Sequence, residues 1–411
     1  MAKIFIGLYD IASQISDWKK GFSALGFETL TATLRKQHIV QRNEVDIDIS
    51  KSWQLSYRGV RPKALQAHLQ DKWHFAKNKV FKRALKECDI FIFIGAGFYE
   101  DYSDFKAIKE KGKKLICIFT GDDCRWYYCM KQEFEMYGMH TMPYEPGYDY
   151  STTNLKSHLT HLRSAEKYAD LIVSIPNQAQ MALRPYYLFK CAVDLDMFPH
   201  RPVQRKIPKI IHAPSSPHFK GTSHFLDAVA KLKNEGVSFD FELIQGIPNK
   251  EAIQKYADAD IILNQLFCPC GGKLAHEGMA LGKVVLTRMA FDKNYDEQTP
   301  EGCPLVDVSP ENIYEVLREI IYDLPRRQRL AEAGRPYVEK NNAVNVVSQR
   351  LLDMLEDNNR FPHFIPSFFK DHFVPESETA IPIYNDWNRY VSGSGWYKQY
   401  VGFFERGRLI F

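Results

Sequence analysis

Two stretches of this 411-residue chain decide its fold: PKIIHAPSSPHFKG, residues 208–221, and EGMALGKVVLT, residues 277–287. In the first stretch a short apolar run leads into a loop of small polar residues that ends in Lys220 and Gly221. The pattern that follows predicts an amphipathic helix starting after residue 222 or 223. A strand, a polar turn with a lysine and a helix N-terminus together form a phosphate site, because backbone N–H groups and the helix dipole favour negative charge.

A phosphate or diphosphate is therefore the predicted ligand of this loop. Lys220 supplies a formal positive charge, and Ser215, Ser216 and their backbone amides share the contact with the anion. His212 and His218 flank the loop. Each is a candidate contact to the ligand, with a hydrogen-bonded structural histidine as the alternative.

Glu277 is a charged residue in an otherwise apolar helical segment. A carboxylate in such surroundings needs a partner, and a mid-helix glutamate can accept hydrogen bonds from two neighbouring hydroxyls. The alternative is an exposed or ion-paired structural glutamate. A loop for a diphosphate followed by a carboxylate for a diol predicts a nucleotide-sugar site.

Length and composition predict a two-domain globular protein. Its residues are 45% hydrophobic and 25% charged, which is typical of soluble chains. The net charge of +4 is small for this length, so no nucleic-acid partner is expected. The first residues lead directly into a strand-like run, no apolar run approaches the ~20 residues of a membrane span, and the eight cysteines have the surroundings of buried free thiols. We therefore expect a cytoplasmic protein.

The spacing of apolar runs predicts an α/β fold with parallel sheets. Continuous apolar runs alternate with helical segments in both halves, which is the doubly wound pattern. The strand-like runs cover residues 3–9, 89–95, 114–121 and 169–175, then 209–213, 241–246, 260–265, 283–287 and 304–308. Prolines and basic residues place a linker at 199–208. We expect a first Rossmann-like domain over 1–200, a second over 201–355 and an aromatic-rich extension over 356–411.

This order of parts resembles the second half of the retaining, GT-B fold glycosyltransferases of glycosyltransferase family 4. GMALGKVV, residues 278–285, stands where the family has Ala-Met-Ala-X-Gly-X-Pro-Val. AVDLDMF, residues 192–198, resembles the family's Asn-Gly-Val-Asp…Phe segment at the crossing between domains. The resemblance implies two Rossmann-like domains that face a central cleft, the first for the acceptor and the second for the nucleotide-sugar donor. It also implies that the C-terminal extension packs back on the first domain.

The resemblance implies roles for individual residues. Glu277 would bind the ribose hydroxyls, and no metal or other cofactor would be needed. The implied donor site consists of Ser215, Ser216, Lys220, Gly221, Gly271, Gly272 and Glu277. One position departs from the family, which has a second glutamate where this chain has Pro269; the transferred sugar and the activity are both open at this point. Cys268 and Cys270 form a Cys-x-Cys pair near His276, for which loop packing is favoured over a metal site.

In the first domain, TGDDCRW, residues 120–126, follows a strand-like run and resembles the Gly-Ser-Asp-x-Arg segment of some bacterial members of these transferases. Asp122 and Asp123 are therefore candidate catalytic residues together with Lys220, and Arg125 is expected to face the cleft. The alternative is a cluster that caps the following helix. Gly7, at the start of the first strand-to-helix loop, is a candidate for the acceptor wall.

A basic amphipathic helix is predicted from Asp71 to Glu87. Its apolar stripe includes Trp73, Val80 and Ala84, and its lysines lie mostly on other faces. An ordinary surface helix docked on its own sheet is one interpretation. The other is peripheral contact with anionic lipid at the inner face of a membrane, which would suit a lipid-linked acceptor.

These observations predict an enzyme that transfers a sugar, with retention, from a nucleotide diphosphate sugar to a glycan, glycolipid or other surface-glycan precursor. Pro269 motivates an alternative, a catalytically degenerate partner subunit of an active transferase. A nucleotide-sugar epimerase of the same fold is a further alternative.

Overall fold

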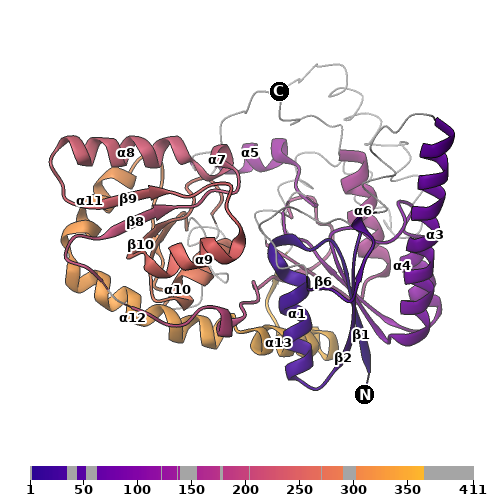
Figure 1. Ribbon diagram of the computed structural model, residues 1–411. Coiled ribbons are helices and arrows are strands. Elements are labelled where there is room, and N and C mark those ends of the chain that lie inside the picture. Colours follow the sequence, from indigo (N-terminus) through magenta and orange to yellow (C-terminus); the bar gives the residue numbers. More distant parts are fainter. Residues whose placement is uncertain are drawn as a thin grey trace.

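The computed structural model describes residues 2–34, 44–51, 63–121, 123–136, 138, 155–175, 179–202, 204–269, 271–289 and 302–364 of the chain. These residues form two domains side by side, each built on a largely parallel sheet with helices on both faces (Figure 1). The predicted α/β class with two doubly wound domains is confirmed. The extension beyond residue 364 lies outside the described residues.

The first domain contains, among the described residues, one sheet of eight strands. Their order is β13 (His363–Phe364), β7 (Tyr186–Leu188), β6 (Leu171–Ser174), β5 (Lys114–Ile118), β4 (Ile90–Ile94), β1 (Lys3–Leu8), β2 (Glu28–Thr33) and β3 (Ile47–Asp48). Neighbouring strands are parallel except that β13 runs antiparallel to β7. The chain reverses its direction of travel across the sheet between β1 and β4, so a ligand crevice is expected at the carboxyl ends of these strands.

Alternation along the strands builds a core on each face of this sheet. In β4, Phe91 and Phe93 belong to one core, whereas Ile92 and Ile94 belong to the other. The helices of this domain are η1 (Ile11–Ser13), α1 (Gln14–Ala24), α3 (Lys63–Glu87), α4 (Ser103–Glu110), α5 (Tyr127–Met136) and α6 (Leu155–Tyr168). Continuous apolar runs were the right signal for the central strands because both of their faces are covered.

The second domain contains five described strands in the order β9 (Asp240–Leu243), β8 (Lys209–His212), β10 (Ile261–Leu263), β11 (Val284–Thr287) and β12 (Val306–Asp307), all parallel. Its helices are α7 (Pro217–Lys220), α8 (Thr222–Asn234), α9 (Asn249–Asp258), α10 (Gly272–Ala280), α11 (Ile313–Tyr322) and α12 (Leu324–Asn341). The strand order reverses between β8 and β10. The loops after these two strands, which carry the predicted donor site, therefore start at the switch point.

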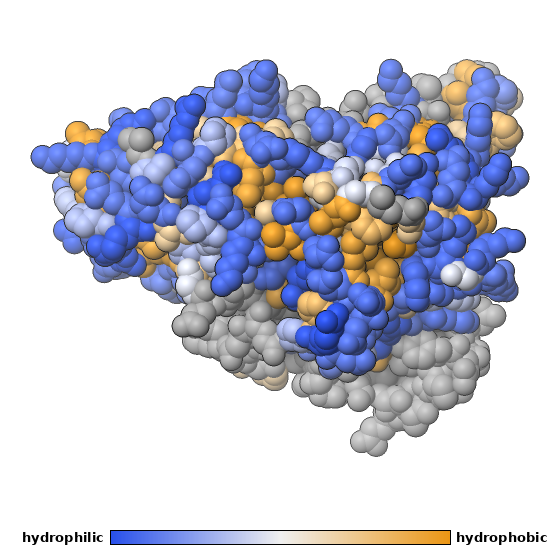
Figure 2. All heavy atoms as spheres, turned by 90° about the horizontal axis from the view of Figure 1, so that it is seen from below, coloured by the Kyte–Doolittle hydropathy of each residue, from blue (hydrophilic) through white to orange (hydrophobic). Residues whose placement is uncertain are grey.

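The chain crosses between the domains twice, and the crossings are paired. Val193, on the way out, forms a parallel bridge with Ala343 on the way back, and Val193 N donates to Asn342 O at 2.8 Å. This crossing precedes the linker predicted at 199–208; Arg201 N in that linker already donates to Leu281 O of the second domain. Seen from below, apolar side chains gather in the middle of the molecule, and hydrophilic ones cover its two ends (Figure 2).

The last long helix, α13 (Val344–Glu356), belongs to the first domain. Val347 and Leu351 lie in the same core as Trp18 of α1. The two helices approach so closely that a Cβ on Gly21 would lie 2.3 Å from Val344 O. The domain boundary predicted at residue 355 therefore comes one helix too late, because the amphipathic pattern of α13 does not show on which core it packs. β13 then continues the return by joining the first sheet.

The basic helix docks on its own domain. α3 spans Lys63–Glu87, and Trp73, Val80 and Ala84 are buried in or against the first core. These three side chains of the stripe are covered by protein, which supports the docked interpretation, whereas Phe75 on the same helix is 73% exposed; peripheral contact with a membrane stays a prediction. In the part of the chain that the structure describes, every helix is too short or too polar to cross a bilayer.

Candidate active site

The Lys220 loop, residues 213–221, connects β8 to α8 at the carboxyl end of the second sheet. Pro217 starts the short helix α7, and Ser216 is its N-cap residue. α7 ends at Gly221, whose φ of 73° is left-handed, and α8 begins at the next residue. Ser215 is exposed and Ser216 is half-buried. The predicted strand, loop and helix are present, with one additional helical turn inside the loop.

Lys220 is held against the loop that follows β10. Its ammonium donates a hydrogen bond to the side-chain carbonyl of Gln265, and the Gln265 amide donates in turn to Cys268 O at 3.0 Å. Gly221 also packs against this loop, since a Cβ added to it would lie 3.1 Å from Leu266 Cβ. The left-handed φ and this contact both favour glycine after Lys220. The cation is thus positioned over the loop that leads to α10.

His212 and His218 have different surroundings. His212 is fully buried, and its ring nitrogens lie 2.8 Å from Leu263 O and 2.8 Å from Thr222 Oγ1. Burial lowers the pKa of His212 to about 4, so its ring is neutral at pH 7. The prediction that His212 faces the cleft is wrong, because both nitrogens hold β10 and α8 together beneath the loop. His218 is half-buried on α7, and its contact with a ligand stays a prediction.

The N-terminus of α10 is the second part of the site. Gly272 has a left-handed φ of 63°, and a Cβ there would meet no described atom within 4 Å. Gly271 is packed instead: its carbonyl accepts from Asn264 Nδ2 at 2.6 Å, and a Cβ would lie 3.2 Å from Ala275 Cβ. Open space in front of the unpaired N–H groups of a first helical turn accommodates an anion.

Glu277 lies more than one turn along α10 and is half-buried. Burial, together with a smaller contribution from the Glu277 charge, raises the pKa of Tyr256 of α9. Ala275 and Met279, on either side of Glu277 in the sequence, are buried in the core. The contact of the Glu277 carboxylate with a ribose stays a prediction.

Asp123 holds together the loop that follows β5. Its carboxylate accepts from Thr120 N at 3.1 Å and from Gly121 N at 2.8 Å. Both amides precede Asp123 in the loop, so these bonds support a structural role within the loop and are not a cap of α5, and a catalytic role of Asp123 stays a prediction. Asp122 lies outside the described residues, so its catalytic role remains untested. Arg125 is half-buried in the same loop.

α5 brings this loop to the second domain. Tyr127, Met130 and Phe134 of α5 form one apolar cluster with Phe267, which follows β10, and Phe219 of α7 packs against it. α5 and α7 are adjacent in Figure 1. The loop after β5 and the Lys220 loop therefore meet at the interface between the domains. No motif in the sequence signals this contact, since the apolar face of α5 is like that of any amphipathic helix.

Gly7 lies inside β1, where it pairs with Phe93 of β4. A Cβ at this position would lie 2.9 Å from Ala32 O of the neighbouring strand. Packing within the sheet therefore favours glycine, and the prediction that Gly7 lines the acceptor wall is wrong. Tyr9, which packs against Gly95, follows β1 instead.

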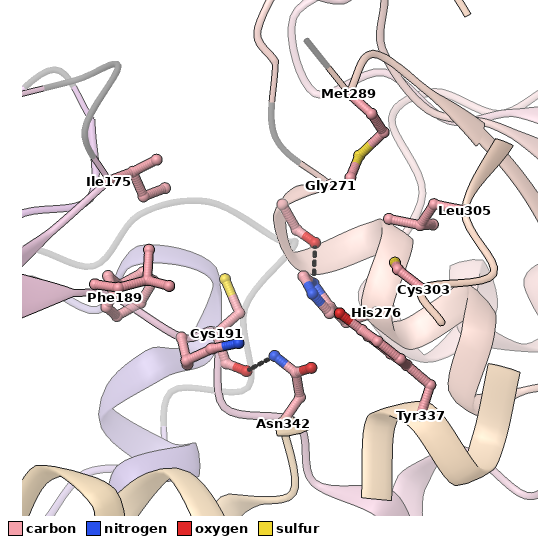
Figure 3. A pocket seen from close by; sticks show the side chains of 13 residues that line it. Ile175, Phe189, Cys191, Gly271, His276, Met289, Cys303, Leu305, Tyr337 and Asn342 are labelled. Atoms are coloured by element: carbon pink, nitrogen blue, oxygen red, sulfur yellow. Dashed lines mark hydrogen bonds between the residues drawn. The ribbon is translucent and has the colours of Figure 1, made fainter. Parts of the chain in front are cut away.

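A pocket of about 560 Å³, counting its open mouth, lies between the domains beside the N-terminus of α10. Phe189 and Cys191 of the first crossing line one side, and Gly271 and His276 line the other (Figure 3). His276 Nδ1 donates to Gly272 O at 2.6 Å. Burial lowers the pKa of His276 to about 4, so the ring is neutral and its Nε2 is an acceptor.

Ion pairs join the two domains next to this pocket. Lys273, in the first turn of α10, bonds through its ammonium to the buried carboxylate of Asp17 on α1 and to Ala192 O. Lys20 of α1 pairs with Asp194 at 2.6 Å. The partners are 256 and 174 positions apart in the chain. Sequence analysis missed them, because a lone lysine carries no signal about so distant a partner.

The described cysteines are free. Cys88, Cys117, Cys124 and Cys129 are buried, as expected. Burial raises the pKa of Cys88 to about 11, so the thiol stays protonated at pH 7. Cys270 lies outside the described residues, and within the described ones no three histidines, cysteines or carboxylates come together as metal ligands.

No protein-family model matches this sequence, and no curated protein matches it. Solved structures do match its fold. HepE from Anabaena, in complex with UDP and glucose, is 12% identical with a TM-score of 0.52, and the match covers 87% of this chain and 100% of that one. Sucrose-phosphate synthase from Thermosynechococcus elongatus is 12% identical with a TM-score of 0.56, covering 88% and 100%.

WaaG, a glycosyltransferase involved in lipopolysaccharide biosynthesis, is 12% identical with a TM-score of 0.52, and the match covers 86% of this chain and 100% of WaaG. A sequence identity of 12% supports a shared fold and nothing more specific. The chain matches these proteins in fold, and its own architecture consists of two Rossmann-like domains with paired crossings and a returning α13. This protein therefore has the GT-B fold.

Proposed function

We propose that the protein is a glycosyltransferase that moves a sugar from a nucleotide diphosphate sugar to an acceptor. The observation that carries the proposal is the contact of the Lys220 loop with the loop that leads from β10 to the N-terminus of α10, at the switch point of the second sheet. Both features favour negative charge. The GT-B fold supports the proposal, and HepE, which shares it, was solved with UDP and glucose.

In this proposal the second domain holds the diphosphate through Lys220, Ser215, Ser216 and the amides of Gly221, Gly271 and Gly272. Glu277 accepts hydrogen bonds from the ribose hydroxyls. Negative charge grows on the leaving diphosphate as the glycosidic bond breaks. Donors that are already in place stabilise this charge more in the transition state than in the ground state, which accelerates the reaction. Lys220 exchanges its bond to Gln265 for one to the diphosphate.

We extend the proposal to transfer with retention, without a metal ion, onto a glycan or lipid-linked surface precursor at the cytoplasmic side. WaaG, with the same fold, is involved in lipopolysaccharide biosynthesis. The first domain supplies the acceptor side, and the candidate contacts to the acceptor are Arg125 of this domain and His218 of the second domain. Closure of the domains around the donor excludes water and favours transfer over hydrolysis.

The test is turnover of a panel of nucleotide sugars with UDP, GDP, ADP and TDP as leaving groups, with and without EDTA. At least one donor should release its nucleoside diphosphate slowly in the absence of an acceptor, and proton NMR should show retained anomeric configuration in the first product. Release that persists with EDTA supports metal independence. If no donor is turned over and none binds, the proposal is wrong.

A partner subunit without activity is the second candidate, favoured by one observation. Pro269 is buried and offers no side-chain acceptor at the place where the family resemblance leads one to expect a glutamate. Binding of a nucleotide sugar without turnover, together with co-purification of an active transferase, would favour this candidate. Turnover by the purified chain alone would exclude it.

A further inference from the structure

The pocket between the domains is lined by one lysine and, among the described residues, by no acidic side chain. Thirteen described residues line it, and they include one lysine, Lys190, and no aspartate or glutamate. The other walls are largely apolar, with Phe189, Met289 and Leu305 among them. Carboxylates are common acceptors for the hydroxyls of a neutral sugar, because each oxygen accepts more than one hydrogen bond. The described lining of this pocket holds no carboxylate and presents a cation instead.

Lys190 has no counter-ion in the described structure. It is half-buried, and among the described residues its ammonium takes part in no hydrogen bond or ion pair. Burial, with the nearby Arg350 charge as a smaller cause, lowers the pKa of Lys190 to about 8. A desolvated cation without a partner is unfavourable, so this side chain is in surroundings that an anion would stabilise.

The N-terminus of α10 opens into the same pocket. Gly272 lines it, and the space in front of this residue is open among the described atoms. The helix dipole favours negative charge there. Two features from different domains, the Lys190 ammonium and the first turn of α10, therefore favour an anion in one pocket.

We propose that Lys190, in the pocket that opens at the first turn of α10, is the cation of a subsite for a carboxylate on the transferred sugar, which makes the donor a nucleotide diphosphate hexuronate. The inference rests on the proposed function. There the Lys220 loop and the amides at Gly271 and Gly272 hold the diphosphate, so the pocket that begins at Gly272 receives the group attached to it. The acceptor Nε2 of His276 is available to a sugar hydroxyl.

The experiment measures equilibrium affinities at pH 7 by calorimetry for UDP-glucuronate against UDP-glucose, GDP-mannuronate against GDP-mannose, and UDP and GDP alone. The proteins are the wild type, Lys190→Met, Lys190→Arg and the matched control Lys111→Met, which removes an exposed lysine of the first domain. The wild type and the control should prefer the hexuronate of one pair by about tenfold to a hundredfold, the range for a hydrogen bond between charged groups. Lys190→Met should abolish this preference without changing the affinity for the diphosphate alone, and Lys190→Arg should keep most of it.

Lys190→Met should melt no lower than the wild type, since it removes an unpaired buried cation, so the comparison is made on folded protein. Equal affinity of the wild type for hexuronates and neutral hexoses, while the nucleoside diphosphate binds, overturns the inference and leaves the proposed function standing. Loss of UDP or GDP affinity in Lys190→Met equal to the loss for the hexuronate also overturns it, because Lys190 would then hold the diphosphate. Failure of every nucleotide to bind the wild type removes the proposed function itself.

Discussion

Gly221 and Gly272 show what single positions contribute to this site. Both have left-handed φ values, and both stand where a strand-to-helix connection turns toward the switch point of the second sheet. Local sequence was sufficient to place both glycines between a strand and a helix, and their contact with a diphosphate stays a prediction. Local sequence was not sufficient for His212 and Gly7. Their burial depends on strands and helices that arrive from elsewhere in the chain.

Glu277 is the residue whose two interpretations differ most in what they predict. If its carboxylate accepts from both ribose hydroxyls, Glu277→Gln keeps one acceptor and removes the charge. Nucleotide affinity should then fall about tenfold or more, and the preference for ribo- over deoxyribonucleotides should shrink, with melting nearly unchanged. The measurement is a titration with matched ribo- and deoxyribonucleoside diphosphates. A much lower melting temperature with affinity intact would instead assign Glu277 to a structural pair.

At the scale of the element, the buried histidine under the Lys220 loop couples β8, β10 and α8. The pKa of His212 is about 4 in the folded chain, below the ~6.5 of an unfolded histidine. Between pH 7 and 5 the unfolded chain therefore takes up a proton that the folded chain does not. The contribution of His212 to the free energy of unfolding is therefore present above pH 6.5, and it should fall by about 2 kcal/mol from pH 7 to pH 5.

The variant His212→Gln isolates this effect. It should be less stable than the wild type at pH 7, because Gln cannot span both hydrogen-bond partners, Leu263 O and Thr222 Oγ1, and it should lose about 2 kcal/mol less between pH 7 and 5. Chemical unfolding at the two pH values provides the comparison. Parallel pH dependence of wild type and variant would show that His212 is protonated in the folded state at pH 5.

Strands and helices were predictable from the sequence where a single local pattern of apolar residues determined them. The central strands were found because a continuous apolar run covered on both faces has few alternatives, and α10 was found because its apolar residues recur with helical spacing. The short α7 was not, since one helical turn leaves no periodicity. α3 was identified as a helix, but its partner was open, because an apolar stripe with Trp73 and Val80 suits a sheet and a membrane equally.

At the scale of the whole molecule, α1 and α10 are joined by the buried pair of Asp17 and Lys273. Lys273→Met leaves the Asp17 carboxylate buried without its cation, which typically costs about 3–5 kcal/mol. The melting temperature should fall clearly, and the double variant Lys273→Met/Asp17→Leu should recover part of the loss. Lys206→Met, which removes an exposed lysine of the linker, is the control. If Lys273→Met melts like the wild type, the domains are not held together by this pair.

The relation of the two domains was the least predictable part of the molecule. The sequence divides into two doubly wound halves by its own pattern, but the return of α13 and the contact of α5 with Phe267 involve residues far apart in the chain. The pocket beside α10 follows from these contacts. Neither Lys190 nor Lys273 could be assigned to it before the two halves were placed against each other.

The central claim is that the Lys220 loop holds the diphosphate of a nucleotide sugar, and the most direct measurement is nucleoside diphosphate affinity in wild type and Lys220→Ala. Calorimetric titration, with Lys111→Ala as control and a melting curve for each protein, should show binding weakened about tenfold to a hundredfold in Lys220→Ala, because a charge-assisted hydrogen bond contributes about 1.5–3 kcal/mol. The melting temperature should be nearly unchanged. Unchanged affinity in Lys220→Ala, with the nucleotide bound by the wild type, would contradict the claim.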